Sequence, residues 1–172
     1  RSTARLKKLP KLFKFLLKYN MKYGDVFVTS PKIEGIIGIL PWPSGKMTEW
    51  RIIKNGGLKL PFSLGFDFVS REGALNNITK KVHHEQASKP HIYCFLLAVH
   101  PNEQGKGFAS HLIRHALEIC DKRQLAFYLE TGKRVNVDIY KHFGLEVVDY
   151  YKFEETGIEV WFMIRPVQSH DL

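Results

Sequence analysis

Hydrophobic and polar residues follow two periodicities along this chain, and together they predict a mixed α/β fold. Leucines and phenylalanines recur at helical spacing over residues 3–19, with lysines between them. Helical spacing returns over residues 108–123, and a shorter helix is expected over 136–143. Apolar runs that predict strands lie at residues 25–30, 33–40, 91–99, 125–130, 145–153 and 158–165.

Breaks between these runs set the expected boundaries. Gly24 is expected to stop the first helix, and Pro41 to Gly45 are expected to form a loop. Residues 46–88 are expected to be helical in two or three pieces. The first starts near Lys46 or Thr48, a second begins at Pro61, and a third is capped by Ser70 and runs to about Gln86.

The order of these elements is helix, two strands, helices, then β-α-β-α-β-β. It predicts an α/β (α+β) domain, in which a mixed sheet carries helices on its faces. The run at 91–99 is apolar at nearly every position, which suits a strand buried on both faces. No linker is evident, so a single domain over residues 1–172 is expected.

Charge is distributed unevenly. The net charge is +9, but residues 1–22 hold eight of the 26 basic residues and no acidic one, which leaves about +1 for the rest. This near-neutral body argues against a nucleic-acid partner. Residues 1–22 form a basic amphipathic helix, which either covers the sheet or docks on an anionic surface.

Cysteine and histidine usage points to no metal and no disulfide. Cys94 and Cys120 lack CxxC or zinc-type spacing, so we expect buried free thiols in a reducing, cytoplasmic setting. The run 83–85 (His-His-Glu) and the pair His111 and His115 have no third ligand at a typical spacing. Solvated or capping histidines are expected there. No apolar run is long enough to span a bilayer.

The segment 99–109, Val-His-Pro-Asn-Glu-Gln-Gly-Lys-Gly-Phe-Ala, joins a predicted strand to a predicted helix. Such a loop presents unpaired backbone N–H groups at the positive end of a helix dipole, where a pyrophosphate binds well. A dinucleotide fold is disfavoured, because its Gly-x-Gly-x-x-Gly fingerprint fails at Ser110.

This segment resembles the central signature of the GNAT superfamily of acetyl-CoA-dependent N-acetyltransferases through Gln104, Gly107 and Ala109. A second signature of the family is matched by Asn136, Tyr140 and Gly144. The resemblance implies a mostly antiparallel central sheet in which the fourth and fifth family strands splay apart. It also implies that the strand and helix with which family members begin have no counterpart before about residue 5.

By this resemblance, acetyl-CoA is the expected cofactor, held partly by backbone groups of a bulged strand end and partly by the loop and first helical turn. The cofactor-binding residues that it implies are Leu97, Ala98, Val99, Gln104, Gly105, Lys106, Gly107, Phe108, Ala109, Ser110, Asn136 and Tyr140. The chain departs from the family at Phe108-Ala109, where Ile-Gly is more common, and at Leu145, where Phe is usual.

Two residues are the expected catalysts. Tyr140 would protonate or stabilise the thiolate that leaves, and Glu130 would remove a proton from the attacking ammonium. The alternatives are a tyrosine that only packs on the sheet and a carboxylate that only forms a surface salt bridge. Asn136 has the alternative of a helix N-cap. Weaker candidates for the acceptor side are Glu34, Trp42, His91 and Tyr93.

A finer resemblance is to the branch that includes puromycin N-acetyltransferase, through residues 91–93, 128–131 and Trp42-Pro43. It implies a small primary amine as acceptor, with direct transfer and no covalent enzyme intermediate. Acetylation of a peptide N-terminus or lysine is the alternative within enzymes, and a partner-docking module without catalysis is the alternative outside them. The protein is expected to be a monomer or a homodimer.

Overall fold

The computed structural model describes residues 3–59, 77–87, 89–154 and 156–168. The helices are α1 (Thr3–Tyr23), α2 (Glu49–Lys54), α5 (Phe108–Arg123), α6 (Arg134–Lys141) and an unlabelled one over residues 77–86. Short 3₁₀ turns cover Gly57–Lys59 and Pro101–Glu103. The strands are β1 (Asp25–Val28), β2 (Gly35–Trp42), β3 (His91–Val99), β4 (Ala126–Thr131), β5 (Glu146–Phe153) and β6 (Ile158–Arg165).

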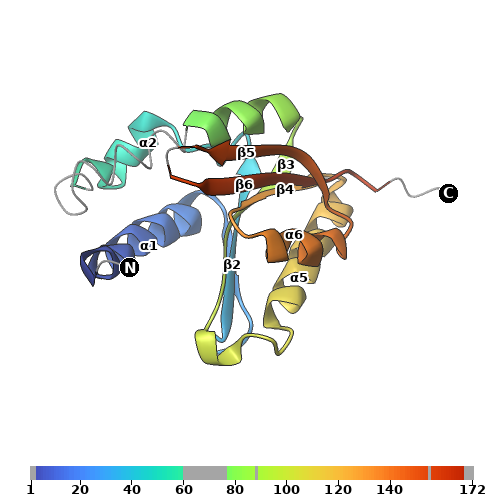
Figure 1. Ribbon diagram of the computed structural model, residues 1–172, viewed down its shortest axis with the longest axis horizontal. Coiled ribbons are helices and arrows are strands. Elements are labelled where there is room, and N and C mark those ends of the chain that lie inside the picture. The colour runs from blue at the N-terminus through green and yellow to red at the C-terminus, as the bar shows by residue number, and fades with distance from the viewer. Residues whose placement is uncertain (1–2, 60–76, 88, 155, 169–172) are drawn as a thin grey trace.

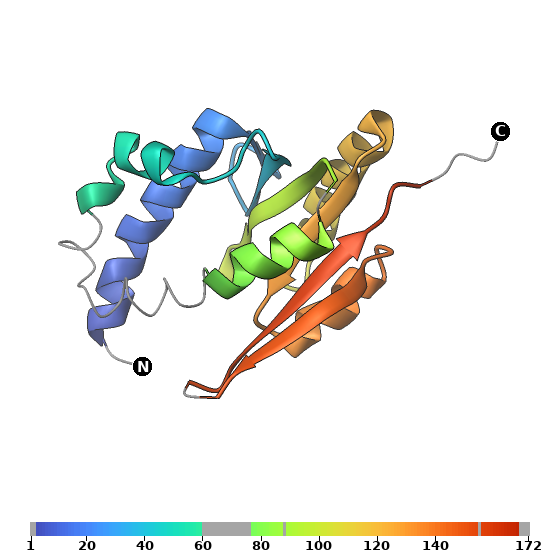
Figure 2. The same ribbon diagram turned by 90° about the horizontal axis from the view of Figure 1, so that it is seen from above.

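The six strands form one sheet in the order β1-β2-β3-β4-β6-β5, and among these described strands β3/β4 is the only parallel pair. Helices α5 and α6 lie on one face, whereas α1 and the helix over 77–86 lie on the other (Figures 1 and 2). The predicted fold class, a mixed and mostly antiparallel sheet with helices on both faces, is therefore confirmed. In the described part of the chain, no helix is long and apolar enough to cross a membrane.

Alternation along the strands divides the buried side chains between the two faces. The larger cluster joins Ile92, Cys94 and Leu129 to apolar residues of α5 and α6. The second cluster joins Tyr128 and Phe162 to the helix over 77–86. Because neighbouring strand residues point to opposite faces, Tyr93 and Glu130 fall on the second face, between the sheet and that helix.

Helix α1 is docked to the end of β2 by buried polar contacts. The Tyr19 hydroxyl, which is fully buried, donates to the carbonyl oxygen of Lys46 at 2.9 Å. The Asn20 amide donates to the carbonyls of Asp25 and Ile39, both at 3.0 Å. Buried polar groups must be satisfied in this way, and here the contacts fix the backbone of the loop that follows β2.

Most predicted boundaries agree with the structure, and the exceptions have physical reasons. The first helix runs past residue 19 to Tyr23, because only Gly24 stops it. Pro41 and Trp42 are strand rather than loop, and they pair with Ile92 and His91. Strand β1 begins opposite Ile39, so β2 has no β1 partner beyond that residue and the missing N–H of Pro41 is tolerated there.

In the segment 46–88, Thr48 caps α2 and the helix ends at Asn55, as predicted. A later helix does end at residue 86. The expected starts at Pro61 and Ser70 lie outside the described residues. The helix expected over 136–143 covers residues 134–141 instead, and its N-cap is Lys133.

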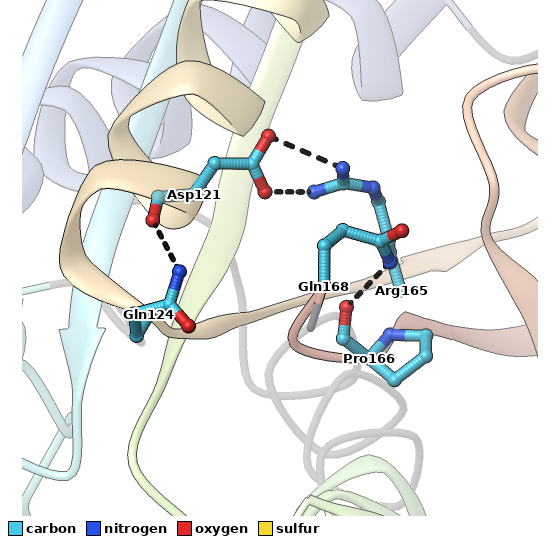
Figure 3. A network of polar contacts seen from close by, with 5 residues as sticks. All are labelled: Asp121, Gln124, Arg165, Pro166 and Gln168. Atoms are coloured by element: carbon cyan, nitrogen blue, oxygen red, sulfur yellow. Dashed lines mark hydrogen bonds and ion pairs between the residues drawn. The ribbon is translucent and has the colours of Figure 1, made fainter. Parts of the chain in front are cut away.

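An ion pair ties the end of the sheet to the end of α5. The guanidinium of Arg165, at the end of β6, donates to both carboxylate oxygens of Asp121, at 2.7 and 3.2 Å (Figure 3). The nearby Gln124 amide donates to the Asp121 carbonyl at 2.9 Å. The bidentate geometry is the stronger form of this contact, and it anchors the far end of the helix whose first turn belongs to the site.

Candidate active site

Strands β3 and β4 pair over only part of their length. Residues 91–93 pair with 126–128, and the described strands show no pairing between them beyond Tyr93. From there β3 continues along β2 to Val99, whereas β4 continues along β6 to Thr131. The backbone groups that the two strands direct at each other beyond Tyr93 therefore have no strand partner. This is the splay that the sequence resemblance predicted.

The bulge in β3 does not lie at residues 97–99, where it was expected. Those three residues pair in regular register with Ile37, Ile36 and Gly35. The register between β2 and β3 shifts instead where Gly38 faces Leu96 and Ile39 faces Cys94, which leaves Phe95 without an opposite residue. The bulge thus lies close to the point where β3 and β4 separate. An extra residue bends a strand, so the bulge helps to turn β3 away from β4.

The loop between β3 and α5 presents an uncapped helix start. Gly107 is the N-cap residue and makes no side-chain cap bond. It adopts φ +85° and Gly105 adopts φ +80°, a left-handed conformation that favours glycine. An added Cβ at either position would meet nothing within 4 Å, so the loop is open outward. Its first-turn N–H groups suit an anionic ligand.

Two side chains of this loop bond within it. The Gln104 amide donates to the Val99 carbonyl at 3.3 Å, which ties the loop to the end of β3. The Lys106 ammonium lies 2.9 Å from a carboxylate oxygen of Glu103, and both are on the surface. The Gln104 side chain therefore fixes the shape of the loop, whereas the loop backbone and the Lys106 side chain face solvent.

Helix α6 places Tyr140 beside the separation of the strands. Tyr140 is 9% exposed and packs in the cluster that contains Cys94, the first β3 residue beyond the paired stretch. Burial raises the pKa of Tyr140, with a smaller contribution from Cys94, so the phenol keeps its proton. Asn136 lies one turn earlier and donates to the Thr131 hydroxyl at 3.2 Å. It is not the N-cap, so the N-cap interpretation of Asn136 is wrong.

Glu130 lies on the opposite face of β4 and lines a pocket with about 460 Å³ of empty space, including its mouth. The Tyr93 hydroxyl donates to its Oε2 at 2.6 Å. Burial raises the pKa of Glu130 from 4.5 to about 7, although the hydrogen bond from Tyr93 opposes the shift. The buried Tyr128 hydroxyl has no hydrogen-bond partner among the described residues. A carboxyl with this pKa exchanges a proton readily near neutral pH.

A pair of histidines forms the wall beside Glu130. His83 Nε2 lies 2.7 Å from His91 Nε2, and His91 Nδ1 lies 2.8 Å from the Lys89 carbonyl. The Nδ1 of His83 is 3.9 Å from Oε1 of Glu130. Burial lowers the pKa of His83 to about 3 and also lowers that of His91, so both rings are neutral at physiological pH.

His83 is the residue of this site that sequence reasoning missed. It is 4% exposed, contrary to the expectation of a solvated side chain, whereas its neighbour His84 is exposed as expected. Its ring stacks on Trp42 at 4.1 Å and on Tyr128 at 4.2 Å between centroids. The sequence feature that could have indicated its burial is its position next to Val82, which faces inward on an amphipathic helix.

The other candidates divide between the pocket and the rest of the fold. Trp42 and Tyr93 line the pocket, and His91 lies behind His83. Glu34 does not belong there: its carboxylate accepts from Thr29 and Ser30 in the turn between β1 and β2. That turn lies next to Gly35, which pairs with Val99, at the other end of β2 from Trp42.

Both cysteines are free and buried, as expected. Burial raises the pKa of Cys94 and of Cys120 to about 12 each. A thiol with so high a pKa holds almost no thiolate at neutral pH, and thiolate is the nucleophilic form. Neither cysteine therefore suits the role of a nucleophile.

This arrangement can be compared with known proteins. Residues 74–145 match the model of the acetyltransferase (GNAT) family. An uncharacterized N-acetyltransferase of Schizosaccharomyces pombe is 28% identical over 172 residues, which cover 95% of this chain and 68% of the relative.

Solved structures share the fold. The crystal structure described as histone acetyltransferase HPA2 and related acetyltransferase from Corynebacterium glutamicum aligns over 100% of this chain and 81% of its own, with TM-score 0.66 and 18% identity. Arylalkylamine N-acetyltransferase 2 from Aedes aegypti aligns over 92% and 80%, with TM-score 0.60 and 16% identity.

The family model thus matches the part of the fold from the helix over 77–86 to α6, and the relative that aligns along the chain is an N-acetyltransferase. Members of the GNAT family use acetyl-CoA. The described residues fit that cofactor in two places. The separated edges of β3 and β4 offer backbone partners for an extended arm, and the open glycine loop offers N–H donors for a pyrophosphate.

Proposed function

We propose that this enzyme acetylates the primary amine of a small molecule by direct transfer, with Glu130 as general base and Tyr140 as general acid. The observation that carries the proposal is the position of Glu130. Its carboxyl lines a pocket, partly walled by aromatic rings, on one side of the separated strands, with a pKa of about 7. The residue stretch 1–172 would act as one catalytic domain.

Acetyl-CoA supplies an acetyl group activated as a thioester. Leu97, Ala98 and Val99 would hold its extended arm through their backbone, and the loop from Gln104 to Ser110 would hold its pyrophosphate. Asn136 lies near the separated ends of β3 and β4, because its amide donates to the Thr131 hydroxyl at the end of β4. Because these groups are fixed by the sheet and by α5, they position the acyl donor before the amine arrives.

Glu130 would take one proton from the bound ammonium, directly or through water. The free amine nitrogen then forms the new N–C bond to the thioester carbonyl carbon, and the C–S bond breaks. Tyr140 would give its hydroxyl proton to the departing sulfur and regain one, through water, from the newly bonded nitrogen, which becomes a neutral amide. Glu130 and Tyr140 approach from opposite faces of the sheet, and both interact electrostatically with Cys94, the residue just past the paired stretch.

The finer resemblance to the puromycin N-acetyltransferase branch supports a small acceptor. Of the positions that carry it, Trp42, Tyr93 and Glu130 line one pocket. His91 and Tyr128 pack against the His83 ring that also lines it. The rings of these residues contact one another through stacked and edge-on pairs. The two buried free thiols suit a reducing compartment such as the cytoplasm.

The test combines binding and turnover. Acetyl-CoA should raise the melting temperature, because it binds the native state alone. Thiol release should then follow with small primary amines and remain at background with peptides that present an N-terminus or a lysine. Turnover of peptides in preference to small amines would refute the proposed acceptor class while leaving the acetyltransferase assignment in place.

A further inference from the structure

The charges around the pocket of Glu130 point to a narrower acceptor class. Resting on the proposed function, we propose that the acceptor is a primary amine that also carries an anionic group, such as a carboxylate, a few bonds away. The amine end would lie between Glu130 and His83, and the anionic end would lie toward Lys46 and Lys80. All four side chains line the pocket.

The amine end is defined by hydrogen-bond donors and acceptors. The Lys89 carbonyl only accepts, so His91 must carry its proton on Nδ1, and its Nε2 must accept. His83 Nε2 must then be the donor in the 2.7 Å contact between the two rings. The Nδ1 of His83 is therefore an acceptor, 3.9 Å from Oε1 of Glu130. A primary ammonium has enough N–H donors to satisfy both acceptors at once.

The walls between the two ends are apolar and aromatic. Leu40, Met47, Trp42, Tyr93 and Phe95 line the pocket, and the Tyr93 hydroxyl is already committed to Glu130. Such walls favour a short carbon spacer, and the aromatic rings also favour an ammonium. They carry no positive charge for a substrate anion, and the ammonium groups of Lys46 and Lys80 are the cationic groups among the described residues that line the pocket.

The mouth carries positive charge. Lys46 and Lys80 are both exposed, and Glu130 is the only acidic residue among the described residues that line the pocket. Lys46 lies 5.6 Å from the centre of the Trp42 ring and near enough to His83 to act on it electrostatically. Its backbone is fixed, because its carbonyl accepts from Tyr19. A second ammonium, as in a diamine, would meet like charges here.

Three substrates of similar length test this proposal: 4-aminobutyrate, butylamine and 1,4-diaminobutane. At low ionic strength, kcat/KM with saturating acetyl-CoA should favour 4-aminobutyrate over the diamine by roughly fivefold, as expected of exposed charge pairs. The preference should shrink as salt is added. The double variant K46E/K80E should reverse it, whereas K122E, which changes an exposed lysine of α5 away from the pocket, should leave it unchanged.

A diamine or butylamine used better than 4-aminobutyrate by the unaltered enzyme would overturn the proposal. So would a preference that survives K46E/K80E. Calorimetric titration of the same three amines into the enzyme with CoA separates this inference from the proposed function. Selective binding of 4-aminobutyrate without turnover would uphold the charge assignment and refute the acetyl transfer, and unselective binding would refute the charge assignment.

Discussion

The two halves of the site are built in different ways. The cofactor side, residues 97–110, is one continuous segment in which a strand, a glycine loop and a helix start follow one another. The acceptor side is assembled from four separate segments, which contribute Trp42, His83, Tyr93 and Glu130. The first uses backbone groups that any similar sequence would present. The second depends on side chains that meet only when the sheet is complete.

This difference separates the binding of the cofactor from the selection of the acceptor. In the proposed function, backbone donors bind the part of acetyl-CoA that does not depend on the acceptor. The neutral histidine pair, the aromatic walls and the two lysines would then select the acceptor amine. Changes on the acceptor side should therefore alter turnover and amine selectivity, whereas changes on the cofactor side should alter acetyl-CoA affinity.

The largest effect is expected for Glu130→Gln. Loss of the general base should lower kcat/KM for the amine by roughly 10²–10³-fold, while acetyl-CoA still raises the melting temperature as before. Glu118→Gln, at an exposed position of α5, is the matched control and should keep full activity. In the unaltered enzyme kcat/KM should rise with pH and level off above about 7, where Glu130 is ionised.

The same residue gives a stability test with a definite sign. Glu130 holds its proton up to about pH 7 when folded but only to about 4.5 when unfolded. The folded state binds the extra proton, so this group lowers stability as pH rises from 4.5 to 7, by about 3 kcal/mol in total. The melting temperature of Glu130→Gln should therefore improve relative to the unaltered protein between pH 5 and pH 8. A constant difference would show that the pKa is not raised.

The next largest effect is expected for Tyr140→Phe. Removal of the hydroxyl should lower kcat by roughly 10–10²-fold, because the sulfur then leaves without a proton donor. KM for the amine should change little, since Tyr140 lies on the other face of the sheet from the pocket. Tyr151→Phe, on the exposed part of β5, supplies the control. An unchanged kcat in both variants would leave Tyr140 with a packing role only.

His83→Phe tests the acceptor side without breaking its aromatic stack. Phenylalanine keeps the ring between Trp42 and Tyr128 but lacks Nδ1. Loss of one hydrogen bond to a charged group predicts a roughly tenfold lower kcat/KM, mainly through a higher KM for the amine. His84→Phe, its exposed neighbour, should be silent. Equal effects in the two variants would contradict a direct contact between His83 and the amine.

A smaller effect on the cofactor side is expected for Gly107→Ala. Nothing crowds the new methyl group, so the change acts through the left-handed backbone alone, at about 1 kcal/mol. Gly157→Ala carries the same strain, at φ +65° with equally open surroundings, in the turn between β5 and β6. Both variants should melt a few degrees lower, but only Gly107→Ala should bind acetyl-CoA more weakly, by roughly fivefold.

The sequence predicted the fold well wherever a boundary is marked by local chemistry. Strand β3, helix α5 and strand β6 begin and end as expected, because their apolar patterns stop at proline, glycine or a polar turn. Errors occurred where a distant partner decides the outcome. Trp42 is in a strand because His91 lies opposite, and α6 begins at Arg134 although no capping side chain marks its start.

The candidate site divides in the same way. The loop from Gln104 to Ser110 could be predicted because its residues are neighbours in the chain. Glu130 was selected through family resemblance, but its raised pKa arises from burial beneath residues far away in sequence. The importance of His83 could not be predicted, because its protonation and tautomer depend on His91 and the Lys89 carbonyl.

A substitution that lies outside both halves of the site provides the baseline for the comparison. Asp121→Asn weakens the paired contact to Arg165 at the far end of α5 (Figure 3). The pair is only partly buried, so the free energy of unfolding should fall by no more than about 1 kcal/mol. Acetyl-CoA affinity and kcat/KM should both stay within twofold, measured by calorimetry and thiol release. A larger loss of affinity would mean that the first turn of α5 depends on its last, and the two halves of the site would then not be separable by mutation.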